Sequence, residues 1–196
     1  MKTIGIVLAG GQSKRFGEPK ALALRCGKPF LFYSVEALRP IVDQVVVVAQ
    51  PHIQKQLQLK DVQWIEDVSQ HKGKGPLAGI YSAMKHYEAT WYIVLPCDTP
   101  FIHKKIINKL KEQADDSFDV IVPRVNGRLQ PLIAMYHYRV KSLIYNCLQR
   151  EEYRMHTLLS ACRVKADYFF PKIVGLKFPR RISSILPFFF LESLIP

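Results

Sequence analysis

The sequence predicts a single three-layer α/β domain with a mostly parallel central sheet. Short apolar runs without polar alternation recur along the chain, which is typical of strands that are buried on both faces. Segments with helical spacing of apolar residues alternate with these runs. The chain has 196 residues, of which 48% are hydrophobic, so one domain can enclose a sizeable core.

The first predicted strand and the loop after it carry the clearest chemical signal. Residues 4–8 are almost entirely apolar, and Gly10 and Gly11 follow them. Glycines at the C-terminal edge of a parallel strand let backbone N–H groups approach an anionic oxygen closely. Arg15 and Lys20 add positive charge to the same loop. The segment predicts a phosphate-binding loop, although an ordinary turn with surface cations has the same composition.

The spacing of the glycines excludes two widespread phosphate-binding motifs. The loop is neither Gly-x-x-x-x-Gly-Lys-Ser/Thr nor Gly-x-Gly-x-x-Gly. Residues 8–20, Leu-Ala-Gly-Gly-x-Ser-x-Arg-Phe-Gly-x-x-Lys, resemble the opening signature of nucleotidyltransferases, which transfer a nucleoside monophosphate from a nucleoside triphosphate. The resemblance implies catalytic roles for Arg15 and Lys20. It also implies nucleotide contacts by Lys20 together with Leu8, Ala9, Gly10 and Gly11.

Helical and strand patterns alternate up to a second segment whose residues could bind a ligand. Residues 30–38 show helical spacing, and residues 44–49 form a β-branched block that suits a buried parallel strand. A short polar helix from about residue 53 to residue 59 leads to a predicted strand over 62–65. These elements continue the expected strand–helix alternation.

The acidic pair Glu66-Asp67 and a glycine-rich segment follow the predicted strand over 62–65. Asp67 lies at the strand's C-terminal end, where a solvated loop residue and a functional carboxylate are equally reasonable interpretations. Residues 73–79 are Gly-Lys-Gly-Pro-Leu-Ala-Gly and precede a predicted helix over 80–87, whose N-terminus offers N–H donors to an anion. Gly-Pro-Leu-Ala-Gly is similar to the segment typical of molybdenum cofactor guanylyltransferases. The resemblance implies that the guanine nucleotide is bound by Asp67, Gly75, Pro76, Leu77, Ala78 and Gly79.

A single aspartate follows the next predicted strand, residues 91–95. Asp98 lies in Pro-Cys-Asp-Thr-Pro, where it suits a turn or a helix cap as well as a metal site. Magnesium usually takes one or two carboxylates together with phosphates and water. Pro-Cys-Asp-x-Pro matches the related transferases, so the resemblance implies that Asp98 is catalytic and binds both Mg²⁺ and the nucleotide. Cys97 is predicted to be a packing residue.

The second half of the chain continues the alternation. The predicted elements are a helix over 103–115, strands over 120–123 and 130–136, a helix over 139–150, a helix opening at 154 and a strand over 164–170. The resemblance implies that Arg124, Arg128 and Gln130 bind the phosphate of a pterin acceptor. Solvated loop cations explain the two arginines equally well.

The resemblance ends near residue 170. We therefore expect a nucleotidyltransferase domain over 1–170 and an atypical apolar and basic tail over 171–196. Two interpretations of the tail stay open, namely a frameshifted product and a variant segment that covers a sheet edge or forms an oligomer contact.

Composition limits the partners and the location that we expect. The formal net charge of +12 suits small polyanionic substrates, whereas nucleic-acid binding has the charge alone in its favour because no RNA-binding or zinc-finger motif is present. The 4 cysteines are far apart and lack metal-ligand spacing, which predicts reduced thiols. The sequence shows no signal-peptide pattern and no membrane-spanning segment, so we expect a cytoplasmic protein.

The resemblance implies a Rossmann-like fold of the nucleotide-diphospho-sugar transferase type. It further implies transfer of GMP from GTP to the phosphate of molybdopterin, with Mg²⁺ as cofactor, to give the guanine dinucleotide form of the molybdenum cofactor and pyrophosphate. Other proteins of molybdenum cofactor biosynthesis are expected partners. Three alternatives stay open: a molybdopterin cytidylyltransferase, a sugar-phosphate nucleotidyltransferase, and a non-catalytic nucleotide-binding or RNA-binding relative.

Overall fold

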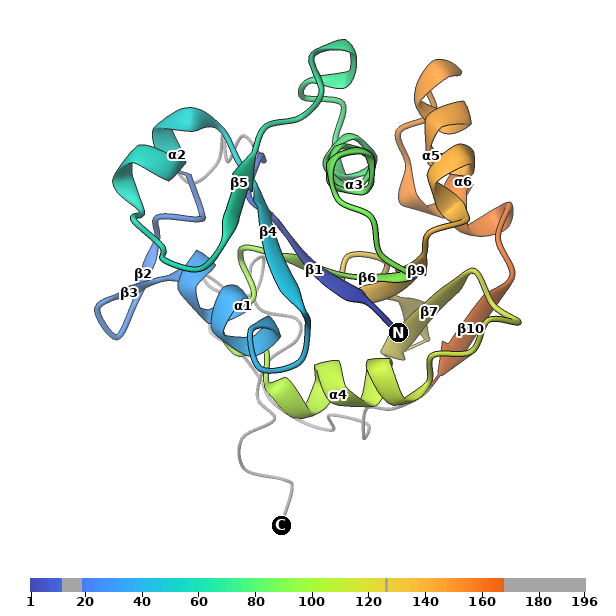
Figure 1. Cartoon of the computed structure of the whole chain (residues 1–196), viewed down its shortest axis with the longest axis horizontal. Helices are drawn as coiled ribbons and strands as arrows, with labels where there is room; N and C mark the ends of the chain where they lie inside the picture. Colours follow the sequence, from blue (N-terminus) through green and yellow to red (C-terminus); the bar gives the residue numbers. More distant parts are fainter. Residues whose placement is uncertain (12–18, 126, 168–196) are drawn as a thin grey trace.

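The computed structural model describes residues 1–11, 19–125 and 127–167, and in this part a central sheet lies between two layers of helices (Figure 1). From edge to edge, the main strands are β10 (Val164–Asp167), β7 (Val120–Val125), β9 (Ala134–His137), β6 (Trp91–Pro96), β1 (Thr3–Leu8), β4 (Gln44–Val48) and β5 (Gln63–Ile65). The α-helices are α1 (Phe30–Leu38), α2 (Pro51–Gln56), α3 (Pro76–His86), α4 (Lys104–Glu112), α5 (Val140–Gln149) and α6 (Met155–Ser160). Strands β2 (Leu24–Arg25) and β3 (Lys28–Pro29) form a separate hairpin, and β8 (Arg128–Leu129) pairs with β7.

Strand β1 lies in the middle of the sheet and pairs in parallel with β4 and with β6. Strands β4 and β5 are also parallel, as are β7 and β10. Strand β9 is the exception, because it runs antiparallel to both of its neighbours, β6 and β7. The predicted α/β class with a mostly parallel sheet is therefore confirmed.

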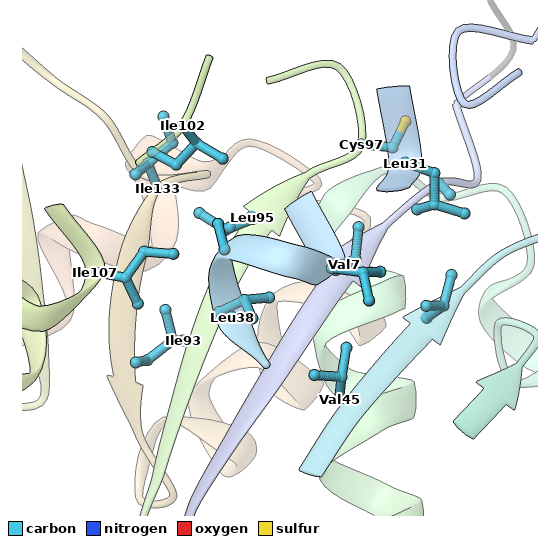
Figure 2. Close-up of a cluster of buried hydrophobic side chains, with 14 of the residues drawn as sticks. Val7, Leu31, Leu38, Val45, Ile93, Leu95, Cys97, Ile102, Ile107 and Ile133 are labelled. Carbon is cyan, nitrogen blue, oxygen red and sulfur yellow. The ribbon is translucent and has the colours of Figure 1, made fainter. Parts of the chain in front are cut away.

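Buried apolar side chains form two cores, one on each face of the sheet. Along β1, Ile4 and Ile6 pack toward α3, α5 and α6, whereas Val7 packs toward α1, α2 and α4. Figure 2 shows the core around Val7, where Ile93 and Leu95 of β6 lie near Leu38 of α1. Because both faces of β1 are covered, its sequence shows no polar alternation.

Gly5 allows α1 to pack closely against β1. A Cβ atom added at Gly5 would lie 3.0 Å from Cδ1 of Leu38 and 3.2 Å from Cγ2 of Val42. Such a Cβ would force these side chains to move, and overpacking of a dense core is destabilising. The glycine inside this strand therefore permits close helix–sheet packing.

Two predicted helices begin earlier than the sequence suggested. The helix predicted over 80–87 begins at Pro76, and the helix predicted from about residue 53 begins at Pro51. Proline lacks the backbone N–H, which has no intrahelical partner in the first turn, and its fixed φ suits that position. Both prolines therefore start a helix where the sequence was interpreted as a loop.

Two predicted strands also differ from the structure. The strand predicted over 130–136 includes a turn, in which the Ile133 N–H donates to the Gln130 carbonyl at 2.9 Å, and β9 begins only at Ala134. The strand predicted over 164–170 is β10 as far as Asp167. Its last three residues and the predicted tail lie outside the described residues, so the domain boundary near residue 170 stays a prediction.

A cluster of charges at the N-terminal edge of the sheet joins β7, β10 and the start of α5. The Asp119 carboxylate accepts hydrogen bonds from the backbone and side chain of Arg163 at 2.9–3.1 Å, and from Nε of Arg139 at 3.2 Å. Only 13% of the Asp119 side chain is exposed. The guanidinium of Arg163 holds the pKa of this carboxyl well below its ordinary value. Burial acts in the opposite direction and raises the pKa, whereas the hydrogen bond from Arg139 lowers it further.

The variant Asp119→Asn should lower the free energy of unfolding at neutral pH by about 2 kcal/mol, because charge-assisted hydrogen bonds are lost from a buried group. A carboxyl whose pKa is depressed on folding stabilises the protein above its unfolded pKa, and this contribution is lost as the pH falls below about 4. Urea unfolding should thus show a smaller difference in the free energy of unfolding between wild type and Asp119→Asn near pH 3 than at neutral pH. Asp61→Asn, at an exposed carboxylate, is the control; equal stability of both variants at neutral pH would contradict the role of Asp119.

Candidate active site

A cavity of about 550 Å³ lies where the parallel strands end. Leu8 at the end of β1, Val48 at the end of β4 and Pro96 at the end of β6 all line it. Loops from the C-terminal ends of parallel strands commonly build the ligand sites of α/β sheets. The cavity is therefore the candidate active site.

The first loop contributes backbone to this cavity. Ala9, Gly10 and Gly11 line it directly after Leu8, and a Cβ atom added at Gly10 or at Gly11 would meet no atom within 4 Å. The absence of side chains here leaves room in the cavity, where a ligand can approach the backbone N–H groups. Arg15, the second cation predicted for this loop, lies outside the described residues.

Lys20 and Asp98 meet in the cavity, although they are far apart in the sequence. Nζ of Lys20 lies 2.7 Å from Oδ2 of Asp98, and the two side chains are 31% and 27% exposed. The backbone N–H of Cys97 donates to the carbonyl of Leu8 at 3.0 Å, which fixes the turn after β6 beside the end of β1. The structure thus brings together a cation and a carboxylate that the sequence identified separately.

Two buried hydroxyl groups support the turn that carries Asp98. The Ser34 and Thr99 hydroxyls both donate to the carbonyl of Pro96, at 2.8 and 3.0 Å, and their oxygens lie 3.0 Å apart. Both residues are buried, and Ser34 comes from the inward face of α1. Sequence reasoning missed this support, although a serine on the apolar face of a predicted helix was a signal.

Cys97 lies next to Asp98 and lines the cavity, yet its thiol is buried. Burial, with the neighbouring Asp98 charge, raises the pKa of this thiol to about 12. The thiolate, which is the nucleophilic form of cysteine, is therefore scarce at neutral pH. This agrees with the packing role that the sequence suggested.

Asp67 lines the opposite part of the cavity, in the loop after β5. Its Oδ2 accepts a hydrogen bond from the Gly73 backbone N–H at 3.1 Å. Burial raises the pKa of Asp67, and this effect outweighs the opposing influence of the Gly73 hydrogen bond and of the Lys72 charge. The carboxylate is held by its own loop while it faces the cavity.

Aromatic packing anchors the loop between Asp67 and α3. His71 is 3% exposed, and its ring packs edge-on against Tyr81 of α3 and Tyr145 of α5 at centroid distances of 5.7 and 6.2 Å. Burial lowers the pKa of His71, so the ring is predominantly neutral at neutral pH. The Val68 N–H donates to the Ser82 hydroxyl at 2.8 Å and adds a polar attachment to α3.

The Gly-Pro-Leu-Ala-Gly segment forms the beginning of α3, and only part of it lines the cavity. Gly75, at φ +78°, is the N-cap, and it lines the cavity with Pro76 and Gly79. Leu77 and Ala78 are fully buried in the core beneath α3 and are absent from the cavity lining. Three of the five predicted contact residues in this segment therefore line the cavity, and the other two pack in the core.

Gly79 brings α3 very close to the end of β1. A Cβ atom added there would lie 2.7 Å from Cδ2 of Leu8 and 3.6 Å from Oδ1 of Asp67. Only glycine fits without moving Leu8, whose side chain lines the cavity. Gly79 thus helps to set the shape of the cavity floor.

Several lining residues were missed by sequence reasoning. They are Ala21, Val48, Gln50, Gly73, Pro96 and Leu132. Gln50 could have been found, because it follows the end of β4 as Asp67 follows β5 and Asp98 follows β6.

The predicted acceptor residues lie in the hairpin that the end of β7 forms with β8 and in the segment that leads on to β9, and they do not line the cavity. Within this part of the chain, Arg124 donates to the carbonyl of Gly127 at 3.0 Å, and Gln130 donates to the carbonyl of Arg128 at 3.1 Å. Leu132 is the part of this segment that reaches the cavity. The proposed acceptor contacts of the three polar residues stay a prediction.

Metal-ligating side chains do not cluster in the part of the chain that the structure describes. Across residues 1–11, 19–125 and 127–167, no group of three or more His, Cys, Asp and Glu could hold a metal ion. Among the described residues, every helix is too short or too polar to span a bilayer.

The Lys20–Asp98 pair should matter little for folding, because both side chains are partly exposed. We expect Lys20→Gln and Asp98→Asn each to lower the free energy of unfolding by at most about 1 kcal/mol. Urea unfolding measures this value, with Lys28→Gln at an exposed lysine of β3 as the matched control. A loss of about 3 kcal/mol or more would instead assign the pair a structural role.

Known proteins similar to this chain identify its family. Residues 5–165 match the family model described as the MobA-like NTP transferase domain. A protein of Bacillus cereus (strain Q1), named "Probable molybdenum cofactor guanylyltransferase", is 48% identical over 165 residues, which cover 84% of this chain and 82% of that protein. Its similarity therefore extends over most of both sequences.

Solved structures extend the comparison to the fold. Molybdopterin-guanine dinucleotide biosynthesis protein A from Archaeoglobus fulgidus has a TM-score of 0.72 at 26% identity, over 84% of this chain and 83% of that chain. CMP:2-keto-3-deoxy-manno-octonic acid synthetase has a TM-score of 0.72 at 17% identity, over 94% of this chain and 97% of that chain, a likeness that shows the fold alone. The expected nucleotide-diphospho-sugar transferase fold is thereby confirmed. With its central motifs, its strand order and this match over most of its length, the chain belongs to the MobA-like NTP transferase family.

Proposed function

We propose that this protein transfers GMP from GTP to the phosphate of molybdopterin and releases pyrophosphate, which gives the guanine dinucleotide form of the molybdenum cofactor. The observation that carries the proposal is the Lys20–Asp98 pair, which lies beside an open glycine backbone in the cavity of a family member. The names of the similar proteins favour guanylyl transfer over cytidylyl or sugar-phosphate nucleotidyl transfer.

The cavity offers separate places for the phosphates and for the base of GTP. The backbone at Gly10 and Gly11 and the ammonium of Lys20 suit the triphosphate, and the resemblance adds Arg15. Asp67 and the start of α3 suit the guanine, because a carboxylate accepts hydrogen bonds from the N1–H and N2–H groups of that base. Leu77 and Ala78 support this region from the core.

Asp98 fits a magnesium ion that arrives with its nucleotide. Its carboxylate lies 2.7 Å from Lys20 and is partly exposed, and magnesium in nucleotide sites commonly takes one or two carboxylates and completes its shell with phosphate oxygens and water. Bound there, Mg²⁺ would neutralise charge on the triphosphate and on the pyrophosphate leaving group. The ion pair with Lys20 holds the carboxylate in place until then.

The residues of the chain act mainly by positioning the reactants and neutralising charge. An oxygen of the acceptor phosphate forms a bond to the α-phosphorus of GTP while the bond from that phosphorus to pyrophosphate breaks. The acceptor phosphate is already ionised at neutral pH, so this step needs no general base. The Lys20 ammonium stabilises charge on the transferred phosphoryl group, and the two glycines orient the phosphates.

The acceptor would enter beside Leu132, where the hairpin between β7 and β9 meets the cavity. Arg124, Arg128 and Gln130 lie in this hairpin and are the proposed contacts of the acceptor phosphate. The proposal includes other proteins of molybdenum cofactor synthesis as partners and a cytoplasmic location. The free thiols of the described cysteines are compatible with that location.

Transfer activity tests the proposal. We expect Lys20→Gln and Asp98→Asn each to slow molybdopterin-dependent release of pyrophosphate from GTP by about a hundred-fold or more, because each change removes charge stabilisation from the reacting phosphates. Lys28→Gln should act like wild type. Since neither site variant is expected to unfold the protein, wild-type rates in both would rule out the assigned roles.

Metal binding should depend on the nucleotide. Titration of the protein with Mn²⁺, followed by electron paramagnetic resonance, should show weak binding alone and tight binding with GTP, because a single carboxylate paired with a lysine is a poor metal site. Asp98→Asn should weaken Mn²⁺ binding to the GTP complex at least about ten-fold. Asp61→Asn is the control; unchanged Mn²⁺ binding in Asp98→Asn would remove Asp98 from the metal site.

A further inference from the structure

Besides the Cys97 thiol, four described residues bring polar side chains to the cavity lining: Lys20, Gln50, Asp67 and Asp98. Lys20 and Asp98 pair with each other, and Asp67 accepts from Gly73. Gln50 is the N-cap residue of α2, but its carboxamide does not cap that helix. Among the described residues, this side chain therefore lies at the cavity wall without a helix-capping role.

Sheet register brings the strand ends that precede Gln50 and Asp67 next to each other. Val48 is paired with Ile65, and the Ala49 N–H donates to the Ile65 carbonyl at 3.0 Å. Gln50 follows Val48 by two residues and Asp67 follows Ile65 by two, so the two side chains leave adjacent strands at the same edge. Both lie on the β4–β5 side of β1, whereas Asp98 lies on the β6 side.

The cavity therefore has two distinct polar ends. The Lys20–Asp98 end suits phosphates and a cation, as proposed above. The other end combines a carboxylate, which only accepts when ionised, with a carboxamide, which can both donate and accept. Apolar side chains of Leu8 and Val48 line the cavity as well and suit the face of a planar base.

We propose that Gln50 determines base specificity by donating from Nε2 to O6 of guanine, while the Asp67 carboxylate accepts from N1–H and N2–H of the same base. This inference rests on the proposed function, since it concerns the GTP of that reaction. Among the common bases, only guanine presents an acceptor followed by two donors along this edge. Adenine presents its N1 lone pair to the carboxylate in place of a donor, and two acceptors that face each other disfavour this base.

Binding of GTP analogues tests this assignment atom by atom. In 6-thio-GTP sulfur replaces O6 and is a weak acceptor, whereas inosine triphosphate lacks the N2 amino group and keeps O6. Isothermal titration should show that Gln50→Leu binds GTP about ten-fold more weakly than wild type, which is the loss of one hydrogen bond in a partly buried site. Wild type should bind 6-thio-GTP less tightly than GTP, and this difference should vanish in Gln50→Leu.

Inosine triphosphate separates Gln50 from Asp67. Removal of the N2 amino group should weaken binding by the same factor in wild type and in Gln50→Leu, because this group donates to the Asp67 carboxylate and not to Gln50. Gln54→Leu, at an exposed glutamine of the same helix, is the matched control and should bind every nucleotide like wild type. An unchanged midpoint of thermal unfolding in both variants excludes a folding defect.

Two results would contradict the role of Gln50 and leave the proposed function standing. One is selective GTP binding that is unaffected by Gln50→Leu, and the other is an equal loss of affinity for GTP and 6-thio-GTP in that variant. A wild-type protein that prefers CTP, UTP or ATP to GTP would instead overturn the proposed function together with the base assignment. The same titrations therefore distinguish the two failures.

Discussion

The parallel pairing of β1 with a strand on each side is the constraint on which the rest of the structure depends. Backbone groups in a sheet covered on both faces must pair with neighbouring strands, and this pairing brings Leu8 level with Val48 of β4 and Pro96 of β6. Three chain segments consequently end at one edge. Short loops from these ends suffice to bring a glycine backbone, a carboxamide and a carboxylate into one cavity.

Local sequence predicted much of the fold because the central strands carry strong local signals. The block Val45–Val48 has both β-propensity and continuous apolarity, and the helix Phe30–Leu38 was predicted with the boundaries that the structure has. The meeting of Lys20 and Asp98 could also be anticipated, because each follows the end of a predicted strand. Their roles in catalysis came from the resemblance and stay proposals.

The features that sequence reasoning missed depend on contacts between distant segments. The short sequence of β9 has no property that distinguishes an antiparallel strand from a parallel one, so its direction follows from pairing with β6 and β7. Ser34 supports the turn after β6 only because α1 packs beneath it. At Pro76 a local rule misled the prediction, since Gly-Pro is typical of loops as well as of helix starts.

The reversed direction of β9 has a consequence for how such a site can diversify. Parallel strands need a crossover helix between them, whereas β7 and β9 are antiparallel and are joined by a short hairpin at the cavity edge. That hairpin can change in length and sequence without altering the register of β1, β4 and β6. The strand ends that carry the proposed nucleotide contacts and the hairpin that carries the proposed acceptor contacts are thus mechanically separable, so the hairpin can change at little cost to the scaffold.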